Sequence, residues 1–194
     1  MDADEDARLV QGLRSGDTAA FDAVYDTYRP RLFGFLVRLS RHRTLAEDLL
    51  DEVWLRLVAS ARTLRPDTRL GAWLFTVARN LYWSHRRSAL LEASLEAGAL
   101  GLWPPAQSWP SPFDSAAASE LERRVERALA ELPPQHRETL LLVAHEGLTP
   151  LEAAGVCGIT PEAMRQRLAR ARAALAQEME LTAPAAELKR RFGT

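Results

Sequence analysis

The sequence predicts an all-α protein of two small helical domains joined by an extended, acidic, proline-containing linker, with a helix-turn-helix in the second domain. Apolar residues recur at helical spacing on both sides of residues 88–119, and no strand-like alternation is evident. The stretch between holds four prolines within nine residues, at 104, 105, 110 and 112, which exclude a regular helix there. We therefore expect domains at 1–87 and 120–180, a linker at 88–119 and a tail at 181–194.

The first helical region is "GDTAAFDAVYDTYRPRLFGFLVRLS", residues 16–40. Its spacing predicts helices with Phe21, Val24 and Tyr25 pointing inward. Pro30 predicts that the helical segment is broken or bent near that position.

The next segment, "TLAEDLLDEVWLRLVA" at 44–59, predicts a helix with two different faces. The apolar stripe consists of Leu45, Leu49, Val53 and Leu57. A second face, at spacing i, i+3, i+4, i+7, consists of Asp48, Asp51, Glu52 and Leu55. Spacing alone favours a solvated surface for these charges, and a partner-binding surface is the alternative.

The helix predicted in "LGAWLFTVARNLYWSHRR", 70–87, combines an aromatic side chain with cations on its outer face. The residues expected to be buried are Leu74, Val77, Ala78, Leu81 and His85. Those expected to point outward are Thr76, Arg79, Asn80, Trp83, Arg86 and Arg87. An exposed tryptophan among arginines is suited to stacking unpaired bases while cations follow the backbone. The alternative is a core aromatic with a charged edge.

In the second domain, "LTPLEAAGVCGITPEAMRQRLARARAAL" at 148–175 predicts two helices joined by a tight turn. Gly158 supplies the positive φ of the turn, and Thr160 caps a helix that begins at Pro161. Met164, Leu168, Ala171 and Leu175 form the buried stripe of that helix. Together the two helices predict a helix-turn-helix.

The opposite face of the second helix presents Glu162, Gln166, Ala169, Arg170 and Ala173. Arg165 and Arg172 border this face on one side and Arg167 on the other. An exposed centre that meets base edges, bordered by cations that meet phosphates, is typical of DNA recognition. The alternative is an ordinary helical hairpin with solvated arginines.

Four sequence blocks carry a family resemblance: "GDTAAFDAVYDTY", "AEDLLDEVWLRL", "WLFTVARN" and, after the linker, the block from "LAELPPQHRETLLL" to Leu175. In this order they resemble an extracytoplasmic-function sigma factor of the sigma-70 family, a small specificity subunit of bacterial RNA polymerase. The resemblance covers nearly all of the chain from Gly16 to Leu175.

The resemblance implies three binding surfaces, which recognise core RNA polymerase and two elements of promoter DNA. The family segment that docks on the polymerase clamp helices corresponds to Asp48, Asp51, Glu52 and Leu55. The segment that holds the melted minus-ten element, with the base-capturing loop "RTLRPDTRL" before it, corresponds to Arg69, Thr76, Arg79, Asn80, Trp83, Arg86 and Arg87. The minus-thirty-five element corresponds to Thr160, Glu162, Arg165, Gln166, Arg167, Ala169 and Arg170. The linker resembles the segment that threads the polymerase active cleft.

The chain departs from the family at two positions. Ser84 stands where the family often has aspartate, and Ala169 stands where a larger side chain is common. A promoter sequence therefore cannot be carried over from the family. Family members are commonly held inactive by an anti-sigma factor, so the resemblance also implies such a partner.

Other classes of protein explain less of the sequence. A helix-turn-helix regulator accounts for 120–180 but leaves the acidic helix and Trp83 without roles. A pure interaction protein lacks a reason for two nucleic-acid faces. An enzyme is disfavoured, because His42, His85, His136 and His145 show no metal spacing and Cys157 has no evident catalytic partner. We expect no cofactor and no metal.

Composition is consistent with a cytoplasmic protein that does not insert into membranes. The longest apolar runs, such as "LLLVA" at 140–144, are far too short to span a bilayer. The amino terminus, "MDADEDARLV", is acidic and unlike a signal peptide. The net charge of −1 does not decide whether the chain binds nucleic acid.

Overall fold

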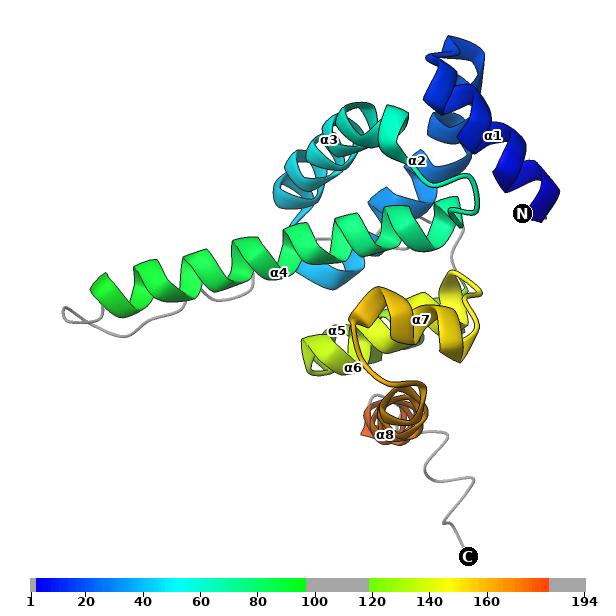
Figure 1. Cartoon of the computed structure of the whole chain (residues 1–194). Coiled ribbons are helices and arrows are strands. Elements are labelled where there is room, and N and C mark those ends of the chain that lie inside the picture. The colour runs from blue at the N-terminus through cyan, green and yellow to red at the C-terminus, as the bar shows by residue number, and fades with distance from the viewer. Residues whose placement is uncertain (1–2, 97–118, 182–194) are drawn as a thin grey trace, which may run out of the picture. The chain divides into compact units, whose positions relative to one another are not determined.

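The computed structural model describes residues 3–96 and 119–181, and every regular element in these two ranges is helical (Figure 1). The described helices form two units: the first unit contains the helices up to residue 96, and the second is built largely from those after residue 119. The predicted all-α fold class is confirmed.

Among the described residues, the first unit contains four α-helices and a short 3-10 helix. Their bounds are α1 Ala3–Ser15, α2 Thr18–Ser40, α3 Arg43–Ser60, η1 Ala61–Thr63 and α4 Leu70–Glu96. The described residues after 118 form four α-helices, of which α6 continues into a π-helix. Their bounds are α5 Glu120–Glu131, α6 Pro134–Leu140, η3 Leu141–His145, α7 Pro150–Cys157 and α8 Pro161–Leu181.

Helix α2 continues through Pro30, so of the two outcomes predicted there, a break or a bend, the break does not occur. A proline inside a helix costs about 3 kcal/mol through a lost hydrogen bond and a ring clash. The residues after Pro30 offset this cost, because Leu32, Phe35, Leu36 and Leu39 are all completely buried. Burial of the second half of α2 therefore keeps the helix continuous.

The core of the first unit lies where α2, α3 and α4 meet. The rings of Phe35 on α2 and Phe75 on α4 pack edge to face, with centroids 5.3 Å apart. Of the three residues that the sequence placed inward on α2, Val24 is buried, whereas Phe21 and Tyr25 are half-buried. Both rings lie beside Trp54 of α3, at centroid distances of 6.3 and 4.8 Å.

Helix α4 continues to Glu96, past the predicted domain boundary at residue 87. The segment after residue 87, "SALLEASLE", contains neither glycine nor proline and consists largely of good helix formers. The segment was predicted to be part of the linker because it lacks basic residues. A change in the charge of a sequence does not, however, end a helix. The predicted proline-rich part of the linker lies outside the described residues.

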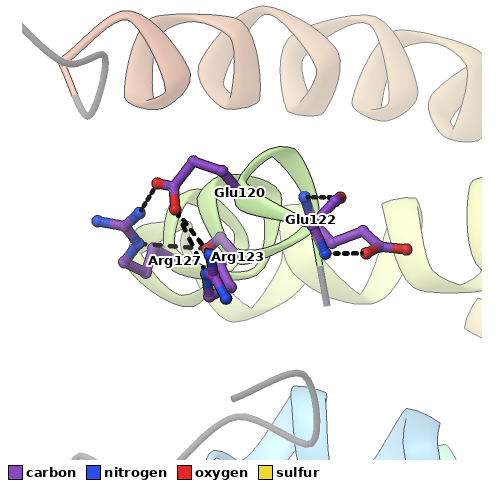
Figure 2. A network of polar contacts seen from close by, with 5 residues as sticks. Glu120, Glu122, Arg123 and Arg127 are labelled. Atoms are coloured by element: carbon purple, nitrogen blue, oxygen red, sulfur yellow. Dashed lines mark hydrogen bonds and ion pairs between the residues drawn. The ribbon is translucent and has the colours of Figure 1, made fainter. Parts of the chain in front are cut away.

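The second unit begins with a capped helix that carries an exposed network of charges (Figure 2). The hydroxyl of Ser119 accepts from the Glu122 amide at 3.2 Å, while the Glu122 carboxylate accepts from the Ser119 amide at 2.6 Å. Glu120 binds Arg123 and Arg127 at 3.1 and 3.0 Å, and the hydrogen bond from Arg123 lowers the pKa of its carboxyl. Because these side chains are exposed, the network adds little to stability.

Arg137 of α6 fixes the other end of α5. Its buried guanidinium donates through Nε to the Leu129 carbonyl at 2.9 Å, and through Nη2 to the Ala130 and Leu132 carbonyls at 2.6 and 2.9 Å. These carbonyls lie at the carboxyl end of α5, where a helix leaves its last carbonyls without their usual i+4 amide partners, and that of Leu129 also accepts from the Leu132 amide at 3.3 Å. One side chain therefore caps α5 and joins it to α6.

We predict that Arg137→Ala lowers the free energy of unfolding of the second unit by about 2–4 kcal/mol, because buried carbonyls lose charge-assisted bonds. Arg123→Ala, on the exposed network of the same helix, is the matched control and should change it by less than about 0.5 kcal/mol. Hydrogen exchange of the α5 amides measures both effects. Equal protection in the two variants would contradict the prediction.

Candidate nucleic-acid interface

One face of α3 combines carboxylates with apolar side chains in contact with solvent. Asp48 and Asp51 are exposed, and Leu55 and Val58 are 64% and 59% exposed. We call these four residues the acidic-apolar face of α3. Glu52 lies at its edge and accepts a hydrogen bond from Nε of Arg56 at 2.7 Å.

Val58 was missed by the sequence analysis, although it follows Leu55 at the same i+3 spacing and so extends the face by one turn. The opposite side of α3 packs as predicted at Leu49, Val53 and Leu57, whereas Leu45 is only half-buried. An exposed Leu and Val beside carboxylates form an apolar strip with an acidic border, a surface suited to a protein partner with basic residues around an apolar contact.

The buried stripe of α4 is rotated from the predicted one. Leu74 and Ala78 are buried as expected, but the other buried residues of the helix are Leu70, Phe75 and Tyr82. Val77 and Leu81 are half-buried, and His85, which was expected inside, is exposed. The prediction that His85 is buried was wrong. Helical spacing gave no weight to Phe75 and Tyr82, whose large rings bury more apolar area than a histidine.

The outward face of α4 contains the predicted residues, but they differ in exposure. Asn80 and Arg87 are exposed, whereas Thr76, Arg79, Trp83 and Arg86 are half-buried. The Trp83 ring lies edge to face with Tyr82 at 5.3 Å, and the Arg86 guanidinium lies 5.6 Å from the Trp83 centroid. Trp83 is therefore less open than predicted, and it is held between an aromatic ring and a cation.

Hydrogen bonds within α4 orient several of these side chains. Nη1 of Arg79 donates to Oδ1 of Asn80 at 3.1 Å, and Nη1 of Arg86 donates to the Tyr82 hydroxyl at 3.1 Å. The Thr76 hydroxyl donates to the Ala72 carbonyl at 2.7 Å. Two guanidinium groups, an amide and an indole are thus gathered along one side of the helix, a combination suited to a nucleic-acid strand with unpaired bases.

Arg69 stands one residue before α4 and contacts another helix. Its Nε lies 3.3 Å from Oδ2 of Asp6 on α1, and its side chain is still about half exposed. The loop that carries Arg69 is therefore tied to the amino-terminal helix of the first unit.

The predicted helix-turn-helix is formed by α7 and α8. Thr149 and Glu152 cap α7 reciprocally, with amide-to-side-chain distances of 3.2 and 2.9 Å. Gly158 has φ +64°, and the Thr160 hydroxyl accepts from the Ala163 amide at 3.2 Å, so α8 begins at Pro161. The predictions for the turn, the cap and the start of the helix are confirmed.

The two faces of α8 follow the predicted division. Met164, Leu168 and Ala171 are buried and Leu175 packs against the same core, which also contains Leu132 and Leu140. The residues of the face expected to meet base edges are exposed, and so is Arg165 at its border; they are Glu162, Gln166, Ala169, Arg170 and Ala173. The structure therefore presents them together on one surface.

Polar contacts along α8 link its exposed residues. Glu162 accepts hydrogen bonds from Arg165 and, at 3.4 Å, from Nε2 of Gln166. Nη2 of Arg170 donates to Oε1 of Gln166 at 3.5 Å. The hydrogen bond from Arg165 lowers the pKa of the Glu162 carboxyl, so this residue is ionised at neutral pH. Glu162 thus neutralises part of the positive charge at the start of the helix.

Arg167 differs in environment from the other arginines of α8. Its side chain is 22% exposed, and its Nη1 lies 3.8 Å from Oε2 of Glu138 on α6, whose side chain is completely buried. The sequence placed Arg167 on an exposed flank, because helical spacing does not show that a buried carboxylate lies beside it. The structure instead directs Arg167 toward α6.

Comparison with known proteins identifies the family. The sigma-70 region 2 model matches residues 24–90, and the sigma-70 region 4 model matches residues 122–175. The RNA polymerase sigma factor CarQ of Myxococcus xanthus is 35% identical over 161 residues, which cover 81% of this chain and 88% of CarQ. This chain belongs to the extracytoplasmic-function sigma factors of the sigma-70 family. It is therefore a non-enzymatic initiation factor that directs RNA polymerase to promoters.

Two further similarities agree with this assignment. The extracytoplasmic-function sigma factor EcfG of Rhodopseudomonas palustris is 34% identical over 146 residues, covering 75% of this chain and 77% of EcfG. The sigma factor RpoE of Bartonella quintana, solved in complex with the anti-sigma factor NepR, superposes with a TM-score of 0.68 at 26% identity. That superposition covers 84% of this sigma factor and 98% of RpoE.

Of the helices in the described part of the sigma factor, none combines the length and apolar character that a bilayer crossing requires. Within the same residues, no group of three or more His, Cys, Asp and Glu side chains is placed to hold a metal ion.

We predict that Arg167→Ala lowers the free energy of unfolding of the second unit by about 1–3 kcal/mol, because the buried Glu138 carboxylate loses a cation. Arg170→Ala, on the exposed face of the same helix, should change it by less than about 0.5 kcal/mol. Urea unfolding followed by hydrogen exchange of the α8 amides distinguishes the two variants. If Arg167→Ala is as stable as wild type, the buried Glu138 carboxylate does not need the Arg167 cation, and the prediction is wrong.

Proposed function

We propose that this sigma factor recognises a minus-thirty-five element through α8 and holds the melted minus-ten element through α4. The observation that carries the proposal is the shared exposed face of α8, where Arg165, Gln166 and Arg170 lie in a row beside a capped helix start. Arginine and glutamine side chains at this end of a recognition helix reach base edges in the major groove.

The side chains of α8 have different roles in this proposal. Arg165, Gln166 and Arg170 contact bases, and Ala169 leaves space beside them because it ends at a methyl group. Glu162 and Thr160 hold the first turn and its arginine in place, through the ion pair with Arg165 and the cap on Ala163. Arg167 serves the packing of α8 more than the contact with phosphates, because it lies against Glu138.

On α4, the proposed contact with the minus-ten element rests on Asn80, Trp83 and the arginines around them. Arg79, Arg86 and Arg87 bind the strand backbone, while the Trp83 ring and the Asn80 amide meet unpaired bases. Trp83 is half-buried, so it offers a ring edge and part of a face that Tyr82 and Arg86 hold in position. Thr76 lies one turn before Asn80 and continues the same surface.

We further propose that the acidic-apolar face of α3 docks on core RNA polymerase. Asp48 and Asp51 provide charge complementarity to a basic surface, and Leu55 and Val58 provide apolar area at the centre of the contact. Glu52 contributes at the edge through its pair with Arg56. The sigma factor acts where the polymerase is, which is the cytoplasm.

An anti-sigma factor is proposed as a regulatory partner. RpoE of Bartonella quintana, 26% identical to this sigma factor, was solved with the anti-sigma factor NepR. A protein that covered the acidic-apolar face of α3 or the outer face of α8 would exclude polymerase or promoter DNA from this sigma factor.

We predict that the double variant Asp48→Arg, Asp51→Arg fails to bind core RNA polymerase, because like charges would then face a basic docking surface. Both side chains are exposed, so the free energy of unfolding should change by less than about 1 kcal/mol. A pull-down with purified core enzyme and run-off transcription from a cognate promoter provide the measurement.

The matched control is Asp22→Arg, Asp26→Arg on α2, which makes the same change of charge at two exposed positions of the first unit. This variant should retain polymerase binding. If the wild-type protein bound promoter DNA tightly as a free dimer and never associated with core enzyme, it would act as an ordinary helix-turn-helix regulator, and the proposal would fail.

We predict that Trp83→Ala leaves core binding unchanged and lowers promoter opening by about tenfold or more, since one base-stacking contact contributes about 1–3 kcal/mol. A template with a pre-melted minus-ten region should recover much of this loss. Circular dichroism monitors folding, because Trp83 also packs on Tyr82. Equal impairment on the pre-melted and duplex templates would contradict a role in melting.

A further inference from the structure

Helix α1 has no part in the surfaces described so far. It ends at Ser15, and the match to the sigma-70 region 2 model begins only at residue 24. Nevertheless α1 packs against α2 and against η1, the short helix that leads into the loop before α4 (Figure 1). This loop, residues 64–69, carries Arg69 directly to the first turn of α4.

Asp6 is the residue of α1 that reaches this loop. Its side chain is only 6% exposed, and its Oδ2 lies 3.3 Å from Nε of Arg69, which is 54% exposed. The second oxygen, Oδ1, is buried and accepts no hydrogen bond within the described residues. The carboxylate is thus placed in the interior with a single oxygen directed at the cation of the loop.

Tyr28 of α2 is close to Asp6 and Arg69 and contacts the first turn of α4. The tyrosine is buried, and a Cβ atom on Gly71 would lie 3.1 Å from its hydroxyl oxygen. The first turn of α4 therefore packs its backbone directly onto Tyr28. Burial and the negative charge of Asp6 raise the pKa of Tyr28 to about 12, so its hydroxyl stays protonated. Residues from α1, α2, the loop and α4 meet at this point.

The buried Asp6 carboxylate is not explained by stability. Burial raises the pKa of its carboxyl, and the Arg69 charge offsets only part of this effect. A carboxyl whose pKa is raised on folding binds its proton more tightly in the folded state, so the free energy of unfolding falls as pH rises through that interval. We therefore expect that an uncharged side chain of the same size would not lower the free energy of unfolding at neutral pH. A residue that costs stability and fixes a loop is best explained by what the loop does.

We propose that Asp6 is a positioning residue, which acts through Arg69 to hold the 64–69 loop and the first turn of α4 in the orientation that binds unpaired promoter bases. This inference rests on the proposed function of α4. Through this pair, α1 sets where Arg69 lies relative to the outward face of α4. The expectation is that loss of the Asp6 charge impairs promoter opening without impairing polymerase binding or folding.

The experiment compares Asp6→Asn, Arg69→Gln, the double variant and Asp4→Asn as full-length proteins with core RNA polymerase. Asp4 lies in the same turn of α1 with an exposed side chain, so Asp4→Asn is matched in chemistry. Opening is measured by permanganate reactivity of unpaired thymines on a duplex promoter. Asp6→Asn should reduce opening by about tenfold, within the range of coupling between contacting residues, and Asp4→Asn should not.

The double variant tests whether Asp6 acts through Arg69. If it does, Asp6→Asn has no further effect once Arg69 is glutamine, and the double variant matches Arg69→Gln alone. Arg69→Lys, which keeps the charge, should retain more opening than Arg69→Gln. Thermal unfolding of Asp6→Asn should be unchanged or shifted to higher temperature.

Three results would overturn the inference alone: wild-type opening in Asp6→Asn, additive losses in the double variant, or a fall in thermal stability large enough to account for the lost opening. A wild-type protein that binds core enzyme but opens no promoter would overturn the proposed function of α4 as well. The wild-type reaction therefore separates the two failures.

Discussion

Two consecutive charged residues of α6, Arg137 and Glu138, hold the second unit together from inside. Successive side chains on a helix point about 100° apart, so one short helix reaches two neighbours. Arg137 binds three carbonyls at the end of α5, and Glu138 lies beside Arg167 of α8. The orientation of the recognition helix therefore depends on buried polar contacts in addition to the packing of Leu132, Leu140 and Leu168. Such contacts are directional, and they favour one arrangement of helices over others that bury similar apolar area.

The exposed charged residues of the protein differ from these buried ones in how much they contribute to folding. The Glu120 network on α5 and the Glu162–Arg165 pair on α8 are open to solvent and contribute little to folding. Because little stability depends on them, such residues can exchange their partners for DNA or protein at small cost. The pair of Asp6 and Arg69 has one buried and one exposed member, since a buried carboxylate holds an arginine that remains half exposed. The same comparison separates Arg167, which serves the fold, from Arg170, which is available for contact.

In the function proposed for this sigma factor, nucleic-acid recognition is divided between the two units. The outer face of α8 is a row of polar side chains on a capped helix, suited to the groove of a duplex. The outer face of α4 places an indole between a tyrosine and an arginine, suited to bases that have left the duplex. The negative charge of the acidic-apolar face of α3 is unfavourable for nucleic acid, which agrees with the protein partner proposed for it.

Local sequence determined the elements whose signals lie within one or two turns. Gly158, Thr160 and Pro161 specified the turn and the start of α8, because a positive φ, a cap and a fixed φ depend only on neighbouring residues. The apolar stripes of α3 and α8 were predicted from helical spacing in the same way. The order of the four sequence blocks was sufficient to identify the family. These features could be predicted because each one is encoded in a short stretch of chain.

The tertiary structure decided what depends on residues far apart in the sequence. Pro30 stays inside α2 because the buried residues after it offset its cost, and His85 is exposed because Phe75 and Tyr82 occupy the core in its place. Arg167 lies beside Glu138, and Arg69 beside Asp6, across separations that no helical spacing describes. In each case the energy of a residue is set by the neighbour that folding brings to it, so its role could not be determined from its own helix.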